Sequence, residues 1–138
     1  MEEIIDADLI SPRQVEAVLT LLNEYAHVDA GGVQLSARAK NDFVTELCER
    51  QGAHIVLAFV EGVPAGMAIC LEGASSFFSK PLLQVRDLIV ARPYRGRGLS
   101  RRILVKAEEV AAQAGCSKLT VEVQEGGISS LLYCGVRT

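Results

Sequence analysis

The residue types best suited to chemistry in this chain gather in one basic segment that also contains glycine. Residues 92–106, RPYRGRGLSRRILVK, hold six of the fourteen Lys and Arg residues and no acidic residue. The segment follows a strand-like run at residues 84–90 and leads into an apolar-periodic helix. Backbone N–H groups at a helix start lack intrahelical partners, the helix dipole favours an anion there, and glycine allows close approach. The segment therefore predicts a site for a phosphate group.

Two other interpretations of the basic segment are a solvated surface and a nucleic-acid patch. Solvation explains neither the glycine spacing nor the position directly after a strand. The rest of the chain carries eight basic residues against seventeen acidic ones, the net charge is −3, and aromatic residues make up only 5%. Such a surface would repel a polyanion, so no nucleic acid is expected as a partner.

The glycine pattern separates three kinds of phosphate site. A dinucleotide-binding domain has G-x-G-x-x-G directly after its first strand, whereas here Gly96 and Gly98 lie late in the chain and Arg101 stands in place of the third glycine. A nucleoside-triphosphate loop requires G-x-x-x-x-G-K-S/T, which this sequence lacks. The remaining interpretation is a cofactor phosphate held by residues 95–100.

Alternating strands and helices must position this turn, and their order predicts the fold class. Ser11 is the expected N-cap of the first helix, with Pro12 at its first position and Gln14 completing a capping box. A hairpin-like turn is expected at residues 61–64. The expected strands are 3–9, 54–60, 65–71, 82–91 and 118–124, and the later helices are 36–50, 98–114 and a short one at 128–133. The order β-α-α-β-β-β-α-β-α predicts an α+β (mixed α/β) fold.

Composition and charge bound the class of protein. The chain has 138 residues, 49% apolar and 22% charged, which predicts one folded domain over residues 1–138. No apolar run approaches the roughly 20 residues of a membrane span. The acidic N-terminus, MEEIIDADLI, is unlike a signal peptide. We therefore expect a cytoplasmic protein without membrane contact.

Cysteine and histidine usage gives no indication of a metal site. The cysteines show no C-x-x-C pair, and the chain has only two histidines. All of the cysteines fall in apolar or helical stretches, which predicts buried thiols in a reducing compartment. They are Cys48, Cys70, Cys116 and Cys134.

Residues 90–104, VARPYRGRGLSRRIL, resemble the acyl-CoA signature of the GNAT superfamily of N-acetyltransferases. The pattern Q/R-x-x-G-x-G/A is met by Arg95 and Gly98, while Ser100 replaces the final glycine or alanine. The preceding strand, the proline at position 93, the EGVPAG turn, the GCSKL helix-to-strand step and the element order also match. The resemblance covers the chain roughly from the first strand to residue 124. It implies a central, mostly antiparallel twisted sheet flanked by helices.

The resemblance also implies acetyl-CoA as the cofactor. In the superfamily the pyrophosphate rests on backbone N–H groups of the turn, here those of residues 95–100, and the pantetheine arm pairs with the end of the fourth strand. Ser100 keeps its N–H, so we expect binding to survive the substitution. The implied cofactor-binding residues are Leu88, Ile89, Val90, Arg95, Gly96, Arg97, Gly98, Leu99, Ser100 and Arg101.

The implied reaction is direct attack of a primary amine on the thioester in a ternary complex, which needs a base for the amine and an acid for the thiol. Asp87 is the first candidate for the base, with Arg86 and Leu88 on the opposite face of the strand. Its alternative role is an ion pair with Arg86 or Lys80. Glu72 and Glu122 are further candidates for the base. Tyr133 matches the end of the family's N-x-x-A-x-x-L-Y segment and is the candidate acid, or a packing residue.

Candidate contacts to the amine are few in the sequence. Tyr25, His27 and Asp29 lie in an expected loop between the first two helices and could bind an amine, as could Glu72 on a flanking strand. An ordinary polar loop explains the first three equally. The resemblance implies a small-molecule or peptide amine as acceptor without naming it.

The C-terminal residues depart from the family. After the tyrosine the family continues with two more strands, whereas this chain ends at residue 138. The strand at residues 118–124 would then have an unpaired edge, which proteins usually cover. Three outcomes are open: a partner chain covers the edge, the fold is a shortened variant, or the tail is altered and catalysis is impaired. Among these we expect a homodimer through this edge. The predicted function is an acetyl-CoA-dependent N-acetyltransferase, and the alternative is a non-catalytic acyl-CoA-binding or regulatory module.

Overall fold

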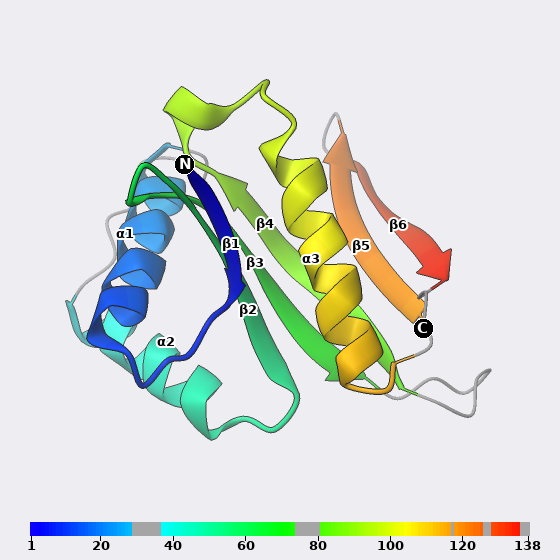
Figure 1. Ribbon diagram of the computed structural model, residues 1–138. Coiled ribbons are helices and arrows are strands. Elements are labelled where there is room, and N and C mark those ends of the chain that lie inside the picture. Colours follow the sequence, from blue (N-terminus) through cyan, green and yellow to red (C-terminus); the bar gives the residue numbers. More distant parts are fainter. Residues whose placement is uncertain (29–36, 74–80, 117, 126–127, 136–138) are drawn as a thin grey trace.

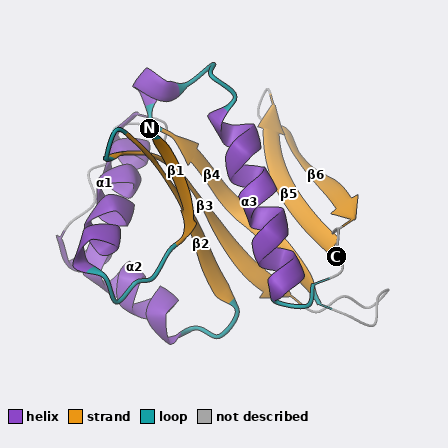
Figure 2. Ribbon diagram, in the orientation of Figure 1, coloured by secondary structure: helices purple, strands orange, loops and turns teal. Residues whose placement is uncertain are grey.

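A six-stranded sheet carries helices on both of its faces (Figure 1; Figure 2). The computed structural model describes residues 1–28, 37–73, 81–116, 118–125 and 128–135. Their elements are, in order, β1 (Glu2–Asp6), α1 (Pro12–Val28), α2 (Ala37–Glu49), β2 (Ala53–Val60), β3 (Val63–Gly73), β4 (Leu82–Val90), the 3₁₀ turn η1 (Arg92–Tyr94), α3 (Leu99–Gln113), β5 (Lys118–Glu125) and β6 (Ile128–Gly135). The predicted α+β fold with a mostly antiparallel sheet is confirmed.

The strands lie side by side in sequence order, from β1 to β6. All neighbouring strands are antiparallel except β4 and β5, which are parallel. A parallel pair needs a crossover connection long enough to return along the sheet. The helix α3 provides that crossover, so the basic turn lies where the chain leaves β4 to enter α3.

Two apolar cores hold the three layers together. Between the sheet and α3, the buried stripe Leu99, Ile103, Ala107 and Val110 recurs at helical spacing. On the other face, Ala17, Val18 and Leu21 of α1 and Leu47 of α2 pack on the sheet. Because both faces are covered, the central strands are apolar almost throughout, as the burial of β2 and β3 shows.

The predicted short helix at residues 128–133 is wrong. These residues form β6, which pairs antiparallel with β5 from Glu125↔Ile128 to Lys118↔Gly135. The run ISSLLY also fits helical spacing, but the open edge of β5 supplies hydrogen-bond partners that favour an extended chain. The edge of β5 is therefore covered by the chain itself, which removes the reason for expecting a dimer there.

The predicted capping box at the start of α1 is also wrong, although the helix does begin at Pro12. The Ser11 carbonyl accepts bonds from the N–H groups of Gln14 and Val15. The Gln14 side chain accepts a bond from the Asp8 N–H instead of reaching Ser11. A turn at residues 8–11, closed by the Ser11 N–H on the Asp8 carbonyl, leads the chain into the helix.

Gly66 on β3 allows α3 to approach the sheet closely. A Cβ atom at this position would lie 2.8 Å from Ile103 Cδ1 and 3.0 Å from the Ile89 carbonyl oxygen. The first contact would require the end of the Ile103 side chain to shift, and the second is tighter than most Cβ contacts and is with backbone, which moves less readily. The close packing of α3 on the centre of the sheet therefore depends on glycine, which has no side chain, at position 66.

We predict that Gly66→Ala lowers the free energy of unfolding by about 1–3 kcal/mol, the usual cost of an added methyl group in a packed core. Chemical denaturation checks the value. Gly73→Ala on the same strand is the matched control, because its Cβ would meet Leu82 Cδ1 at an ordinary 3.6 Å. Equal stability of the two variants would contradict the close approach at Gly66.

The cysteines differ in their surroundings. Burial raises the pKa of the Cys70 thiol to about 12, and the Asp6 carboxylate adds to the rise. Burial, with a contribution from Glu72, also raises the pKa of Cys116. Cys48 is exposed, so the prediction of a buried thiol is wrong at that position. The side chain of Cys134 lies outside the described residues.

We predict that iodoacetamide at pH 8 labels Cys48 quickly and Cys70 and Cys116 slowly. The thiolate is the reactive form, and a raised pKa lowers its fraction at any given pH, so both buried thiols stay protonated. A time course read by mass spectrometry after proteolysis gives the rate for each site. In urea the three rates should converge, and equal rates in the folded protein would refute the burial of Cys70 and Cys116.

Candidate functional site

The parallel pairing of β4 with β5 covers only part of both strands. Its register runs from Leu82↔Lys118 to Val85↔Val121 and then ends. Beyond that point the strands diverge toward the end of the molecule where α3 begins (Figure 1). The last residues of β4 therefore present one edge that β5 does not pair.

A bulge in β4 coincides with the end of this pairing. Opposite β3, Ile69 pairs with Asp87 and Cys70 pairs with Val85, so Arg86 is an extra residue. A bulge bends its strand and changes which residues share a face. Val85 and Leu88 contribute to the core beneath α3, whereas Arg86 and Asp87 both line a hollow beside α2.

The prediction for the faces of β4 therefore needs one correction. Leu88 lies on the face opposite Asp87, as expected. Arg86 shares the face of Asp87, because the bulge breaks the strict alternation on which the prediction relied.

Hydrogen bonding to β3 decides which backbone groups of β4 face the opening. The Ala91 N–H donates to the Ala65 carbonyl at 2.8 Å. Positions bonded to the same neighbour alternate along an antiparallel strand. The N–H and C=O groups of Leu88 and Val90 therefore point away from β3, toward the unpaired side, and those of Ile89 point toward β3. Of the three predicted backbone contacts, Leu88 and Val90 have the required direction.

The chain between β4 and α3 forms two successive turns. In η1, the N–H groups of Tyr94 and Arg95 donate to the carbonyls of Ala91 and Arg92, at 2.9 and 3.3 Å. The Arg95 N–H is thus engaged, although it was predicted to bind phosphate. Gly96 and Gly98 follow with φ of +78° and +75°, a conformation that other residues adopt only with strain.

The start of α3 has no side-chain cap. Gly98 is the N-cap residue and makes no capping bond through a side chain. The first helical bond runs from the Arg102 N–H to the Gly98 carbonyl, at 3.3 Å. The N–H groups that precede it, from Leu99 to Arg101, have no intrahelical acceptor and lie at the positive end of the helix dipole. The first turn of α3 is therefore suited to an anion.

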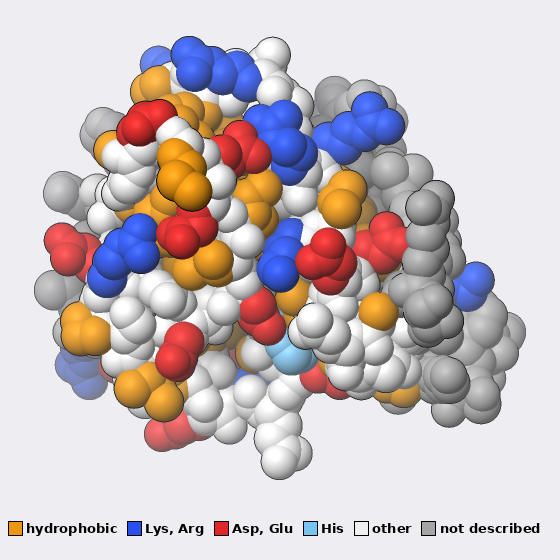
Figure 3. Space-filling view, viewed as in Figure 1, with side chains coloured by type: hydrophobic (Ala, Val, Ile, Leu, Met, Phe, Trp, Pro, Cys, Tyr) orange, Lys and Arg blue, Asp and Glu red, His pale blue; other side chains and the backbone are white. Residues whose placement is uncertain are grey.

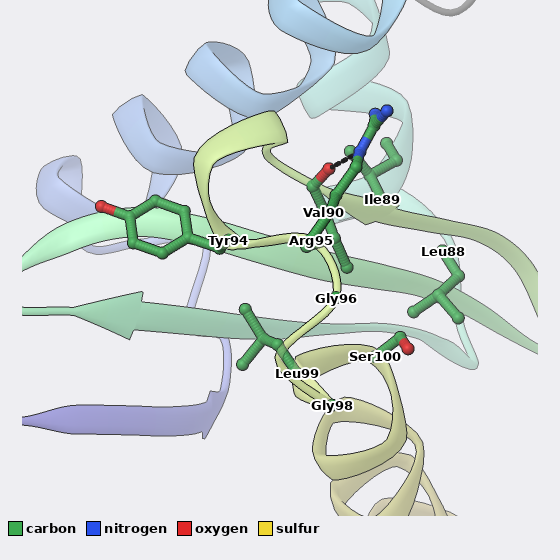
Figure 4. A pocket seen from close by; sticks show the side chains of 9 residues that line it. All are labelled: Leu88, Ile89, Val90, Tyr94, Arg95, Gly96, Gly98, Leu99 and Ser100. Atoms are coloured by element: carbon green, nitrogen blue, oxygen red, sulfur yellow. Dashed lines mark hydrogen bonds between the residues drawn. The ribbon is translucent and has the colours of Figure 1, made fainter.

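A cavity of about 410 Å³ joins the unpaired edge of β4 to the first turn of α3 (Figure 4). The Arg95 side chain crosses one part of it and donates from Nε to the Val90 carbonyl at 2.9 Å. Tyr94, which the sequence analysis missed, also lines it; an aromatic residue directly before the glycine turn was the available signal. The lining residues are Leu88, Ile89, Val90, Tyr94, Arg95, Gly96, Gly98, Leu99 and Ser100.

Basic side chains gather around η1 and the start of α3 (Figure 3). Arg97 lies over the Tyr94 ring, with 5.9 Å between its guanidinium carbon and the ring centroid. Arg97 and Arg101 are exposed and are not among the residues that line the cavity. Arg102 forms an ion pair with Glu2 of β1, and bonding to this carboxylate raises the pKa of its guanidinium.

A second, smaller hollow of about 200 Å³ lies on the other face of β4. Its apolar part comes from α2 and β3, and charged side chains lie beside it. Asp87 and Leu88 are consecutive residues, so the two hollows are back to back across β4. The lining residues are Phe43, Glu46, Leu47, Arg50, Ile69, Leu71, Arg86 and Asp87.

The other predicted acceptor contacts can be placed only by the elements that carry them. Tyr25 and His27 belong to α1, which extends to Val28 and so replaces the predicted loop at these positions. Asp29 lies outside the described residues. Glu72 is bonded to His54, with 2.8 Å between Oε2 and Nε2. It pairs with Leu83 in the register of β3 and β4, at the end of β4 away from the cavity.

Tyr133 and Glu122 lie on the last two strands. Tyr133 was expected on a helix but lies on β6, in register with Thr120 of β5. Thr120 in turn pairs with Gln84, so Tyr133 is at the end where β4 and β5 are joined. Glu122 directly follows Val121, the last residue of β5 that pairs with β4.

Metal and membrane sites can be judged only for the described parts of the chain. There, no group of three His, Cys, Asp or Glu side chains is arranged to hold a metal ion. No described helix combines the length and the apolar character that a membrane span needs.

The fold is that of a known family. Residues 16–133 match the model of the acetyltransferase (GNAT) family, and the chain belongs to it. The predicted resemblance is confirmed. Acetyl-CoA is the cofactor of this family.

Individual relatives are more distant. The N-alpha-acetyltransferase MAK3 of Arabidopsis thaliana is 28% identical over 79 residues, which are 57% of this chain but only 40% of that protein. Among solved structures, the ribosomal-protein-alanine N-acetyltransferase of Brucella melitensis biovar Abortus 2308 has a TM-score of 0.72 at 20% identity, over 91% of this chain and 82% of that one. An aminoglycoside N-acetyltransferase in complex with CoA has a TM-score of 0.72 at 15% identity, over 90% and 78%. At these identities the structures show a shared fold.

Proposed function

We propose that this chain transfers the acetyl group of acetyl-CoA to a primary amine of a small molecule or peptide, by direct attack in a ternary complex. The observation that carries the proposal is the single cavity in which an unpaired strand edge meets an uncapped, glycine-led helix start. An elongated ligand with amide groups at one end and phosphates at the other fits both parts.

The strand end of the cavity suits the amide groups of a pantetheine arm. The backbone groups of Leu88 and Val90 point to the unpaired side, where an extended ligand can pair as an additional strand. The Val90 carbonyl is bonded to Arg95 Nε, so Arg95 must share or release this acceptor when a ligand N–H arrives.

The helix end of the cavity suits the pyrophosphate. The N–H groups at the first turn of α3 and the two glycines allow a phosphate to approach the backbone closely. Exposed Arg97 and Arg101 add positive charge nearby. These contacts need no particular side chain at position 100, which agrees with serine in the place of glycine or alanine.

Bound acetyl-CoA supplies an acetyl group activated as a thioester. The acceptor amine arrives as an ammonium ion and has to lose a proton before its nitrogen can attack. We assign this proton to the Asp87 carboxylate, which lies beside the hollow on the α2 face of β4. The role of Tyr133 as the acid stays a prediction, and its position on β6 does not support it.

The first experiment separates the enzyme from a non-catalytic binding module. We expect acetyl-CoA to raise the melting temperature and thiol release to appear with at least one member of a panel of peptide and small-molecule amines. Stabilisation without thiol release from any amine would favour the module. The absence of stabilisation would refute both functions.

We predict that Ser100→Glu weakens CoA binding at least about 30-fold, roughly 2 kcal/mol, without loss of stability. A carboxylate in the first turn favours the helix dipole but repels phosphates in the cavity. Ser100→Ala is the matched control, and its affinity should stay within about threefold of the wild type, a difference of less than 1 kcal/mol. Calorimetric titration with CoA gives both values. Unchanged affinity in Ser100→Glu would exclude this helix start as the phosphate site.

We predict that Asp87→Asn lowers kcat by a factor of about 10²–10⁴, the range of general base catalysis. The amide has similar shape but cannot accept the proton, so the KM for acetyl-CoA should stay unchanged. Glu72→Gln tests the alternative base and should keep its turnover, because Glu72 is bonded to His54 and lines neither hollow. A loss of kcat in Glu72→Gln alone would reverse the assignment.

A cytoplasmic location and a homodimer remain predictions. With β5 covered by β6, a dimer formed by pairing of strands would use the outer edge of β1 or β6.

A further inference from the structure

One guanidinium connects the start of α3 with the glycine turn directly before it and with β1, one hundred residues earlier in the sequence. Arg102, in the first turn of α3, donates from Nε and Nη2 to the two carboxylate oxygens of Glu2, at 2.6 and 2.8 Å. Its Nη1 donates to the carbonyl oxygen of Arg97 at 3.1 Å. The forked pairing fixes the plane of the guanidinium, and β1 thereby holds the glycine turn through Arg102.

Neither helix stability nor attraction of the ligand accounts for this arrangement. A cation in the first turn of a helix opposes the helix dipole, and the carboxylate of Glu2 offsets its charge. Arg102 is not among the residues that line the cavity. Any effect of Arg102 on a bound anion is therefore indirect. It acts through the position of the backbone to which Arg102 is bonded.

The Arg97–Gly98 peptide group is that backbone. None of the described peptide bonds is cis, and in a planar trans peptide the C=O and N–H bonds point in opposite directions. Because the Arg97 carbonyl points to Arg102, the Gly98 N–H points away from Arg102. Gly98 lines the cavity. We propose that Arg102, held by Glu2, is a positioning residue that aims the Gly98 N–H at the cofactor pyrophosphate.

Gly98 and Arg102 also fit each other sterically. A Cβ atom on residue 98 would lie 3.3 Å from Arg102 Nη1, which is closer than most such contacts. The left-handed φ of Gly98 and the guanidinium position thus require glycine for two separate reasons. This pairing rests on the proposed function only for the identity of the anion.

The test compares CoA with pantetheine, which lacks the phosphates. In Arg102→Met we expect the Kd for CoA to rise about tenfold and the Kd for pantetheine to stay unchanged. In ¹⁵N–¹H spectra, CoA should shift the Gly98 amide resonance strongly in the wild type and weakly in Arg102→Met. Arg102→Lys, which retains the charge and one donor, should recover part of the affinity. A merely structural role would weaken both ligands alike and would overturn the proposal.

Two further variants complete the test. Lys106→Met removes a cation of the same helix that is paired with Glu109, and it should bind CoA as the wild type does. The exchange Glu2→Arg with Arg102→Glu restores an ion pair but no donor for the Arg97 carbonyl, so affinity should stay low. Recovery in the exchange, or wild-type affinity in Arg102→Met, would refute the proposal. A wild-type protein that binds pantetheine but not CoA, or neither, would instead refute the proposed cofactor site and this inference with it.

Discussion

The early end of the parallel pairing between β4 and β5 is the constraint on which the site depends. Pairing stops at Val85 and Val121, directly before the extra residue Arg86. The bulge bends β4 away from its neighbour and leaves backbone groups at Leu88 and Val90 available to a ligand. It also places Asp87 on the opposite face, so one inserted residue separates the cofactor cavity from the hollow beside α2.

The second requirement is that a helix start reaches the end of this open edge. The crossover from β4 to β5 must pass over the sheet, and Gly66 lets α3 lie close to it. The buried stripe of α3, from Leu99 to Val110, then fixes the rotation of the helix. As a result its first N–H groups face the space that β5 has left, and the cavity is bounded on one side by a strand and on the other by a helix end.

The sequence predicted those features that local signals encode. Apolar periodicity, Pro12 and the glycines located most elements to within a few residues and placed the glycine turn correctly between β4 and α3. Features that depend on distant partners escaped prediction. The bulge is visible only against the register of β3, β6 depends on the edge of β5, and the bond from Arg102 to Glu2 joins residues one hundred positions apart. The helix predicted around Tyr133 was wrong for the same reason, because strand β6 forms only against the edge of β5.

The structure also divides roles among arginines that look equivalent in the sequence. Arg95 is bonded to the carbonyl of Val90, Arg97 lies over Tyr94, and the charge of Arg102 is offset by a carboxylate of β1. Salt screens the attraction between exposed side-chain charges and an anion at physiological ionic strength. The N–H groups at a helix start are held in a fixed direction by the backbone. The anion preference that we propose for this turn therefore arises chiefly from backbone geometry, to which Arg95 and Arg102 are bonded through the carbonyls of Val90 and Arg97.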